Sequence, residues 1–370
     1  QFQQTYSRNL NATASVLPHR DFRIDLSLTQ TFSKSHSELY ADTSYNKDSS
    51  FHHLNPYENG SFNISYVNVK KMFTNTGVNS ATYNEFLAGR TIISKRLGTS
   101  NPYTHGVPDP SNPRYYKGYG PFSQDVLIPS FIAAYSGKSA ESAPLLSYKH
   151  DKIQDNPFKY FTPLPNWKVT YNGLSKLPLF SRIFSSFIVN HGYTGTMSMN
   201  GFSSSLLFND LYGLGFPSFL DSNSHNYIPF FQVPNVTISQ AFTPLLGFDM
   251  AFKNNVTAKL EVKKSKMESL SLIDYQIGEN ESTEYVIGIG FRKKGIKLPI
   301  KILGVKKLKN ELICKLDIGL RDDKSSNTFL ANNINVVSRG QKVIRISPTI
   351  DYSVSQKLTL HFFYDRQQSI

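Results

Sequence analysis

Adjacent histidines are the first residues of this chain whose types could support chemistry, in this case metal binding. His52 and His53 are two of nine histidines. In a strand, neighbouring side chains point to opposite faces, which argues against two ligands for one ion. No HExxH sequence and no pair of carboxylates at catalytic spacing accompanies them. We therefore predict no metal site and no catalytic residues.

Glycine and cysteine positions also fail to indicate an active site. Gly288, Gly290 and Gly295 form GxGxxxxG, which differs from both the dinucleotide fingerprint and the P-loop. Glycine inside a strand more often relieves crowding or marks a bend. The single cysteine, Cys314, lies in an apolar row, which favours a packed or lipid-exposed thiol over a nucleophile. A GxSxG elbow is absent, so we expect neither enzyme activity nor a cofactor.

Positive charge is concentrated at candidate strand ends. The formal net charge is +13, with one cluster at Lys263, Lys264 and Lys266 and another from Arg292 to Lys309. Such clusters are typical of solvated turns, and also of surfaces that contact anionic lipid or an acidic partner. No recognition helix or aromatic RNA-reading motif accompanies them, so we do not expect nucleic-acid binding.

Composition favours strands with one apolar and one polar face. Aromatic residues make up 13% of the chain, with 27 Phe, 21 Tyr and one Trp. The mean hydropathy is −0.33 and no window holds 18 consecutive apolar residues, so a transmembrane helix is not expected. A membrane β-barrel meets these limits because alternate residues face water. The chain starts at Gln1 without a visible signal peptide, and we expect a segment of a longer protein.

Period-two alternation is the strongest pattern. After the turn pair Asn254 and Asn255, apolar residues at even positions alternate with polar residues at odd positions, and the same pattern recurs along much of the chain. The expected strands are 3–17, 21–40, 59–74, 166–176, 183–200, 202–212, 236–253, 256–264, 268–279, 283–292, 310–322, 341–354 and 357–366. Most are longer than an ordinary soluble strand and long enough to cross a bilayer at a tilt.

The alternation predicts two faces for these strands. The predicted lipid-facing residues are Phe248, Met250, Phe252, Val256, Leu260, Val262, Leu316, Ile318, Leu320, Ile344 and Ile346. The predicted lumen-facing residues are Lys253, Thr257, Lys259, Glu261, Lys315, Asp317 and Arg321. The expected fold class is all-β, an antiparallel transmembrane β-barrel.

Alternation fails between Asn75 and Pro165. Thr82 and Glu85 have the spacing of a capping box, and the apolar residues that follow fall roughly on one helical face. We expect a partly helical insertion over 75–165, packed at a mouth of the barrel or inside it, between barrel strands in 1–74 and 166–370. A disordered loop is the alternative. A second, shorter insertion is expected over 213–234.

Several segments resemble the SprA (Sov) family, the outer-membrane translocons of the type IX secretion system in Bacteroidetes, in their C-terminal region. The most specific segment is 163–178, with the motif residues Pro165, Asn166, Trp167, Tyr171, Gly173 and Leu174. The other matching segments are 236–242, 244–250, 260–265, 284–290 and 355–366. The resemblance covers most of the chain from about Thr5 onward.

This resemblance implies one arc of a very large single-chain barrel that exports folded cargo proteins across the outer membrane. It also implies a PorV-type outer-membrane barrel and a plug protein as partners, and a role in gliding motility in species that glide. The family has no catalytic residues to transfer. Relative to the family, the chain starts within the barrel and stops at Ile370 without a closing strand.

Three alternatives remain open at this stage. A ligand-uptake barrel or porin shares every periodicity argument. A secreted β-rich adhesin or hydrolase domain would not need a membrane. An outer-membrane enzyme would need His191 or His361 with a nearby serine. The side of the membrane reached by each strand end is also open, because the expected turns at 18–20, 254–255 and 355–356 fall on conflicting sides.

Overall fold

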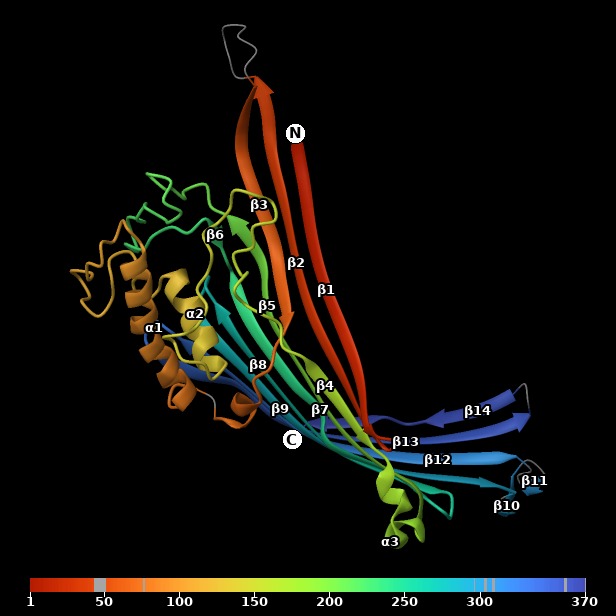
Figure 1. Ribbon diagram of the computed structural model, residues 1–370. Helices are drawn as coiled ribbons and strands as arrows, with labels where there is room; N and C mark the ends of the chain where they lie inside the picture. Colours follow the sequence, from red (N-terminus) through yellow and green to blue (C-terminus); the bar gives the residue numbers. More distant parts are fainter. Residues whose placement is uncertain are drawn as a thin grey trace.

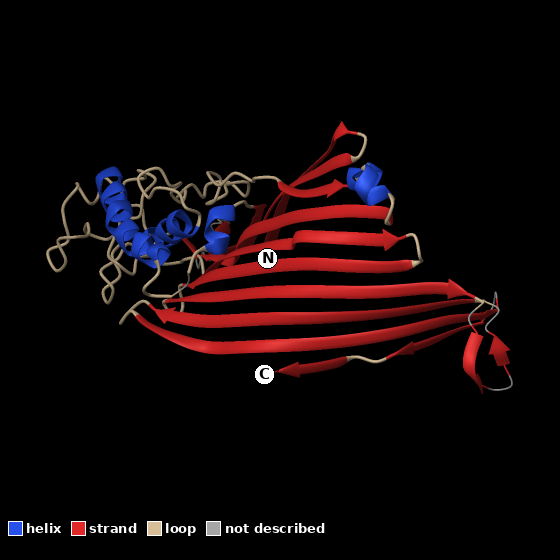
Figure 2. Ribbon diagram, turned by 90° about the horizontal axis from the view of Figure 1, so that it is seen from below, coloured by secondary structure: helices blue, strands red, loops and turns tan. Residues whose placement is uncertain are grey.

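A computed structural model describes residues 1–42, 51–75, 77–295, 297–302, 305–307, 310–355 and 358–369. In these residues, thirteen strands form one sheet in the order β1-β2-β3-β5-β7-β8-β9-β12-β13-β14, with β4, β6 and β15 paired beside this path. Every pairing is antiparallel, which confirms the predicted all-β class (Figures 1 and 2). β1 and β14 end the order, so the described sheet is an open arc.

The strands are β1 (Phe2–His19), β2 (Phe22–Asp42), β3 (Phe51–Ser65), β4 (Asn166–Tyr171), β5 (Phe184–Ser204), β6 (Phe231–Gln232), β7 (Asn235–Phe252), β8 (Val256–Ser271), β9 (Gln276–Lys294), β10 (Lys297–Ile302), β11 (Val305–Lys307), β12 (Glu311–Phe329), β13 (Ile334–Ser355), β14 (Leu358–Phe363) and β15 (Arg366–Ser369). The helices are η1 (Val69–Phe73), α1 (Ala81–Ser100), α2 (Gln124–Tyr135), η2 (Gly173–Lys176) and α3 (Pro178–Ser181). β10 and β11 form a separate hairpin.

Several strand boundaries differ from the sequence prediction. The expected strand 59–74 ends at Ser65, and the 3-10 helix η1 follows. The expected strand 202–212 does not form, because β5 ends at Ser204 and a loop begins. The expected strand 268–279 is a hairpin that joins β8 to β9. The turn at Asn254–Asn255 forms as predicted, with Asn255 at a φ of 65°, a conformation that asparagine tolerates well.

One position in the sheet is shared by two strands far apart in sequence. Ser27 of β2 pairs with Asn166 of β4, whereas Gln30 pairs with Ile64 of β3. β3 and β4 also both pair with β5 on their other side. The chain therefore leaves the sheet in mid-strand after Ser65 and re-enters it at Asn166, with 66–165 forming the insertion.

Two helices organise this insertion. Ser80 is the N-cap of α1, and its hydroxyl accepts a hydrogen bond from Tyr83 N at 3.1 Å, so Thr82 and Glu85 do not form the predicted capping box. Both instead contact Lys71 Nζ, at 3.1 and 2.6 Å. α2 is almost wholly buried and contains Pro129. None of the described helices is long and apolar enough to cross a membrane.

The hydrophobic core lies between the insertion and the sheet. Phe131 and Ile132 of α2 belong to one buried cluster with Phe62, Ile238 and Leu270 of the strands. Figure 1 looks along the sheet, whose strands fan from the upright β1–β3 to the nearly horizontal β12–β14. α1 and α2 lie outside the angle between these two sets of strands.

The two ends of the strands differ in their connections. The turns between β1 and β2 and between β7 and β8 lie at one end, together with α3 (Figure 1), and we name this the turn end. The β8–β9 and β12–β13 turns and the connection 205–234 lie at the opposite end, named the insertion end.

Candidate functional site

Strand register places the predicted lipid-facing residues on one face. Phe248 of β7 pairs with Leu260, Leu260 with Ile287, Ile287 with Ile318, and Ile318 with Ile346. Directly paired residues of antiparallel strands point to the same face, so this row crosses five strands without interruption. Neighbouring rows of the same face contain the remaining predicted residues Met250, Val256, Val262, Leu316, Leu320 and Ile344, and Phe252 pairs with Phe184 at the end of β7.

This apolar face is not covered by protein in the structure. Leu260 is 40% exposed, Ile287 48% and Ile318 39%, although all three lie within long, paired strands. Along β12 the face is apolar from Leu312 to Leu320. At about 3.4 Å per residue and a tilt of about 40°, that length covers about 21 Å of height, which is close to the apolar band of about 25 Å on membrane barrels.

The predicted lumen-facing residues lie on the opposite face, with one exception. Asp249 pairs with Lys259, Lys259 with Gly288, and Gly288 with Asp317. Thr257, Glu261, Lys315 and Arg321 share this polar face. Lys253 does not, because β7 ends at Phe252 and Lys253 lies in the following turn.

Several charges on the polar face are paired with one another. Lys259 lies 2.9 Å from Glu261, and Arg321 Nε lies 2.9 Å from Asp323. Exposed ion pairs of this kind contribute little to stability. A Cβ at Gly288 would lie 2.5 Å from Asp317 Oδ1, so glycine leaves room for that carboxylate, in agreement with the sequence interpretation.

The insertion is seated on the apolar face, beyond the end of the apolar band. Even positions of β8 share one face from Val256 to Leu270, because the β8–β9 register is continuous. This face is apolar up to Val262 and then changes to Lys264, Lys266 and Glu268. η1 contacts Lys264 and Lys266 of this face, so the insertion covers the apolar face and not the polar one.

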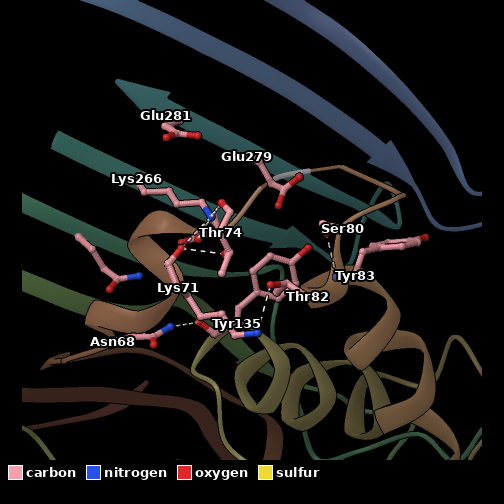
Figure 3. A network of polar contacts seen from close by, with 12 residues as sticks. Asn68, Lys71, Thr74, Ser80, Thr82, Tyr83, Tyr135, Lys266, Glu279 and Glu281 are labelled. Carbon is pink, nitrogen blue, oxygen red and sulfur yellow. Dashed lines mark hydrogen bonds and ion pairs between the residues drawn. The ribbon is translucent and has the colours of Figure 1, made fainter. Parts of the chain in front are cut away.

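A network of polar contacts fixes the start of the insertion to the sheet (Figure 3). Lys266 Nζ donates to the carbonyl oxygens of Lys71 and Thr74, at 3.0 and 3.2 Å, at the end of η1. Glu279 of β9 accepts a hydrogen bond from Gly77 N at 2.7 Å. Lys266 also lies 3.4 Å from Glu268, and both are buried. Sequence reasoning missed this network because its partners come from segments far apart in the chain.

The family-motif residues form the point where the chain re-enters the sheet. Asn166 Oδ1 accepts a hydrogen bond from Gly195 N at 2.8 Å, and Trp167 stacks on Tyr193 with ring centroids 4.6 Å apart. Tyr171 packs against Phe22, and a Cβ at Gly173 would lie 2.6 Å from Tyr171 Oη. Pro165 precedes β4, and Leu174 lies in η2. These residues therefore position a strand and a turn.

The residues considered for catalysis or metal binding are dispersed. His53 pairs with Glu38 at 2.7 Å, His191 contacts the carbonyl oxygen of Leu245 at 2.6 Å, and His361 pairs with Asp351. Cys314 lies on the apolar face opposite Phe291. Within the described residues, no group of three or more His, Cys, Asp or Glu side chains could hold a metal ion.

Known proteins give little guidance. No family model and no curated protein matches the chain. Among solved structures, the chain is similar to OmpT, an outer membrane protein of Vibrio cholerae folded in vitro and solved as a trimer. The identity is 6% and the TM-score 0.22, over 100% of this chain and 90% of that chain. A TM-score of this size does not establish a common fold.

Proposed function

We propose that this chain is one arc of a large outer-membrane β-barrel that conducts folded proteins, as in the type IX secretion translocons of the SprA (Sov) family. The observation that supports the barrel most strongly is the uninterrupted apolar row from Phe248 to Ile346, which crosses strands long enough to span a bilayer and is exposed from Leu260 onward. The secretion role is supported by the motif resemblance, whose most specific segment is 163–178.

In this function the two faces have different roles. The apolar face anchors the wall in lipid, and the polar face lines an aqueous passage. Ser, Thr and Asn dominate the polar face of β2, β3 and β5, and paired charges dominate that of β8, β9 and β12. A hydrated polar wall offers passing proteins little apolar surface to bind. Transport is then passive, and the partners are cargo, a PorV-type barrel and a plug protein.

The location of the insertion follows from the same assignment. Because the insertion covers the apolar face beyond the band, it lies outside the lumen, against the outer surface of the wall and above the lipid. Of the two places that the sequence left open, at a mouth of the barrel or inside it, this assignment favours the mouth. The two longest excursions, 66–165 and 205–234, extend toward the insertion end, which is typical of the extracellular end of outer-membrane barrels.

Site-specific photo-crosslinking in intact cells tests the secretion role. A photo-reactive amino acid is placed at Lys259 or Asp317 on the polar face and, as matched controls, at the neighbouring Leu260 or Ile318 on the apolar face. We expect adducts with secreted cargo only from the polar positions, and adducts with lipid from the apolar positions. Cargo adducts should accumulate when export is stalled.

Two results would contradict the proposal in different ways. Lipid adducts at Leu260 and Ile318 without cargo adducts at Lys259 and Asp317 would support the alternative of a ligand-uptake or porin-type barrel. Equal, lipid-free labelling of both faces would remove the membrane assignment and favour a secreted β-rich domain.

A further inference from the structure

A short segment with exposed leucines projects at the turn end of the sheet. Between β4 and β5 the chain forms η2 and α3, at the end of the strands remote from the insertion (Figure 1). Leu179 is 73% exposed, Leu177 47% and Ile183 50%. Apolar side chains so exposed on neighbouring residues indicate a surface that is covered in the working protein.

The segment is held against the sheet by aromatic packing. Phe180 of α3 contacts Phe184 and Phe187 of β5, with ring centroids 6.0 and 5.3 Å apart. Phe187 contacts Phe248, and Phe184 contacts Phe252, at 5.9 and 4.7 Å. Phe187 and Phe248 belong to the apolar face. The exposed leucines are therefore continuous with the face that we assign to lipid, at its margin.

Positive side chains surround these leucines. Lys176 and Arg20 pair with Asp21, whereas Arg182 and Lys253 have no acidic partner among the described residues. Arg182 lies between α3 and β5, and Lys253 lies in the adjacent β7–β8 turn, with its backbone N–H bonded to the carbonyl oxygen of Ile183 at 3.2 Å. Two unpaired cations thus flank the exposed apolar residues.

We propose that this foot, formed by Leu177, Leu179, Ile183, Arg182 and Lys253, binds anionic phospholipid headgroups at the bilayer surface. The leucines and Ile183 enter the boundary between headgroups and acyl chains, and the two cations meet lipid phosphates. An apolar surface bordered by cations is the composition that binds anionic membrane surfaces. The proposal rests on the assignment of the apolar face to lipid under the proposed function.

The first experiment compares lipid compositions with the full-length protein in bilayer nanodiscs. The lipid is phosphatidylcholine alone, or the same lipid mixed with phosphatidylglycerol. We expect phosphatidylglycerol to raise the midpoint of thermal unfolding of the wild type. The double variant Arg182→Gln/Lys253→Gln should lose most of this shift. In phosphatidylcholine alone, the variant and the wild type should unfold at the same temperature. The matched control Arg114→Gln/Lys117→Gln, in exposed positions of the insertion, should keep the shift.

A nitroxide at position 179 tests where the leucines lie. With Leu179→Cys labelled in nanodiscs, we expect faster relaxation by oxygen, which concentrates in lipid, than by a water-soluble nickel complex. Leu211→Cys, exposed in the 205–234 connection, should show the opposite preference. Access of nickel to position 179 would overturn the proposal that the foot binds lipid. So would a double variant whose unfolding midpoint still rises fully with phosphatidylglycerol.

A third label separates this failure from failure of the proposed function. A nitroxide at Ile318→Cys reports on the apolar face itself. Oxygen-selective relaxation at 318 with nickel access at 179 would reject the foot and keep the barrel wall. Nickel access at both positions would reject the lipid assignment on which the foot depends.

Discussion

At the scale of single residues, the direction of a side chain from the sheet decides which solvent it meets. Neighbours such as Asp317 and Ile318 differ by one position and lie on opposite faces of the same strand. A charge placed in the apolar row would have to enter hydrocarbon, whereas a charge in the polar row stays in water. This contrast separates a membrane wall from a sheet with water on both faces.

We predict that Ile318→Arg impairs assembly far more than Asp317→Arg. Arginine on the lipid face near the middle of the bilayer costs roughly 2–4 kcal/mol, and a lumen-facing arginine costs little. The fraction of the full-length protein that is folded in the outer-membrane fraction measures this, as the heat-modifiable species on a gel. Similar losses for the two variants would show that the faces are wrongly assigned.

A second residue-scale prediction concerns a buried carboxyl in the insertion. Asp125 Oδ2 accepts a hydrogen bond from Tyr148 Oη at 2.8 Å, whereas Oδ1 has no partner in the described structure. Burial raises the pKa of Asp125 to about 6 from 3.8. The folded insertion therefore favours the protonated acid, and its stability should fall as the pH rises from about 4 to about 6 and then level off.

Asp125→Asn should remove this pH dependence. Asparagine can accept the Tyr148 hydrogen bond and stays neutral, so the expected gain in local stability is about 2–3 kcal/mol at pH 8 and close to zero at pH 4. Hydrogen-exchange protection of α2 amides, corrected for intrinsic exchange rates, measures it. Glu141→Gln, at an exposed position, is the control and should change neither value. Unchanged protection in Asp125→Asn at pH 8 would refute the prediction.

At the scale of elements, the most unusual feature is that β3 and β4 share one position in the sheet, with the insertion leaving the sheet between them. Gly195 of β5 faces the gap between Ser65 and Asn166, with its carbonyl oxygen accepting from Tyr66 N at 2.8 Å and its N–H donating to Asn166 Oδ1. A Cβ on Gly195 would overlap the carbonyl oxygen of Tyr66. The chain can leave the wall here because residue 195 has no side chain.

We therefore predict that Gly195→Ala loosens the insertion from the wall. Overpacking against backbone costs typically about 1–3 kcal/mol, and here it acts at the departure point of the insertion. Limited proteolysis of the assembled protein should cut within 66–165 at a higher rate than in the wild type. Gly340→Ala on β13, where a Cβ would meet no atom within 4 Å, should behave as the wild type. Equal cleavage rates in both variants would contradict this role for Gly195.

The shared position of β3 and β4 also shows which parts of the fold the sequence could predict and which it could not. Alternation depends on chain neighbours alone, so the faces of Leu316, Ile318 and Leu320 followed from their spacing. The early end of β3 could not be predicted in this way, because the residues after Ser65 still include apolar positions. Whether they continue the strand depends on contacts with Gly195 and Asn166. The position of the insertion against Lys266 and its neighbours also depends on contacts between residues far apart in the sequence.

At the scale of the whole molecule, the number of spanning strands decides which end each turn occupies. The sequence prediction counts 268–279 as a spanning strand, which places the turn at 355–356 opposite those at 18–20 and 254–255. In the structure 268–279 is the hairpin between β8 and β9, and the β1–β2, β7–β8 and β13–β14 connections all lie at the turn end. Residues 356 and 357 lie outside the described part, but the strands they join are placed.

The two long excursions lie at the opposite end from these three turns, which defines one orientation and predicts the labelling pattern of intact cells. Long excursions are typical of the extracellular side, so we expect the turn end on the periplasmic side and the short β8–β9 and β12–β13 turns on the extracellular side. With Cys314 replaced by serine, a membrane-impermeant maleimide should label Leu211→Cys in the long 205–234 connection of intact cells. Arg20→Cys and Asn254→Cys, in turns at the other end, should react only after the outer membrane is permeabilised. The reverse pattern would invert the barrel, place the insertion in the periplasm and move the Arg182–Lys253 foot to the outer leaflet.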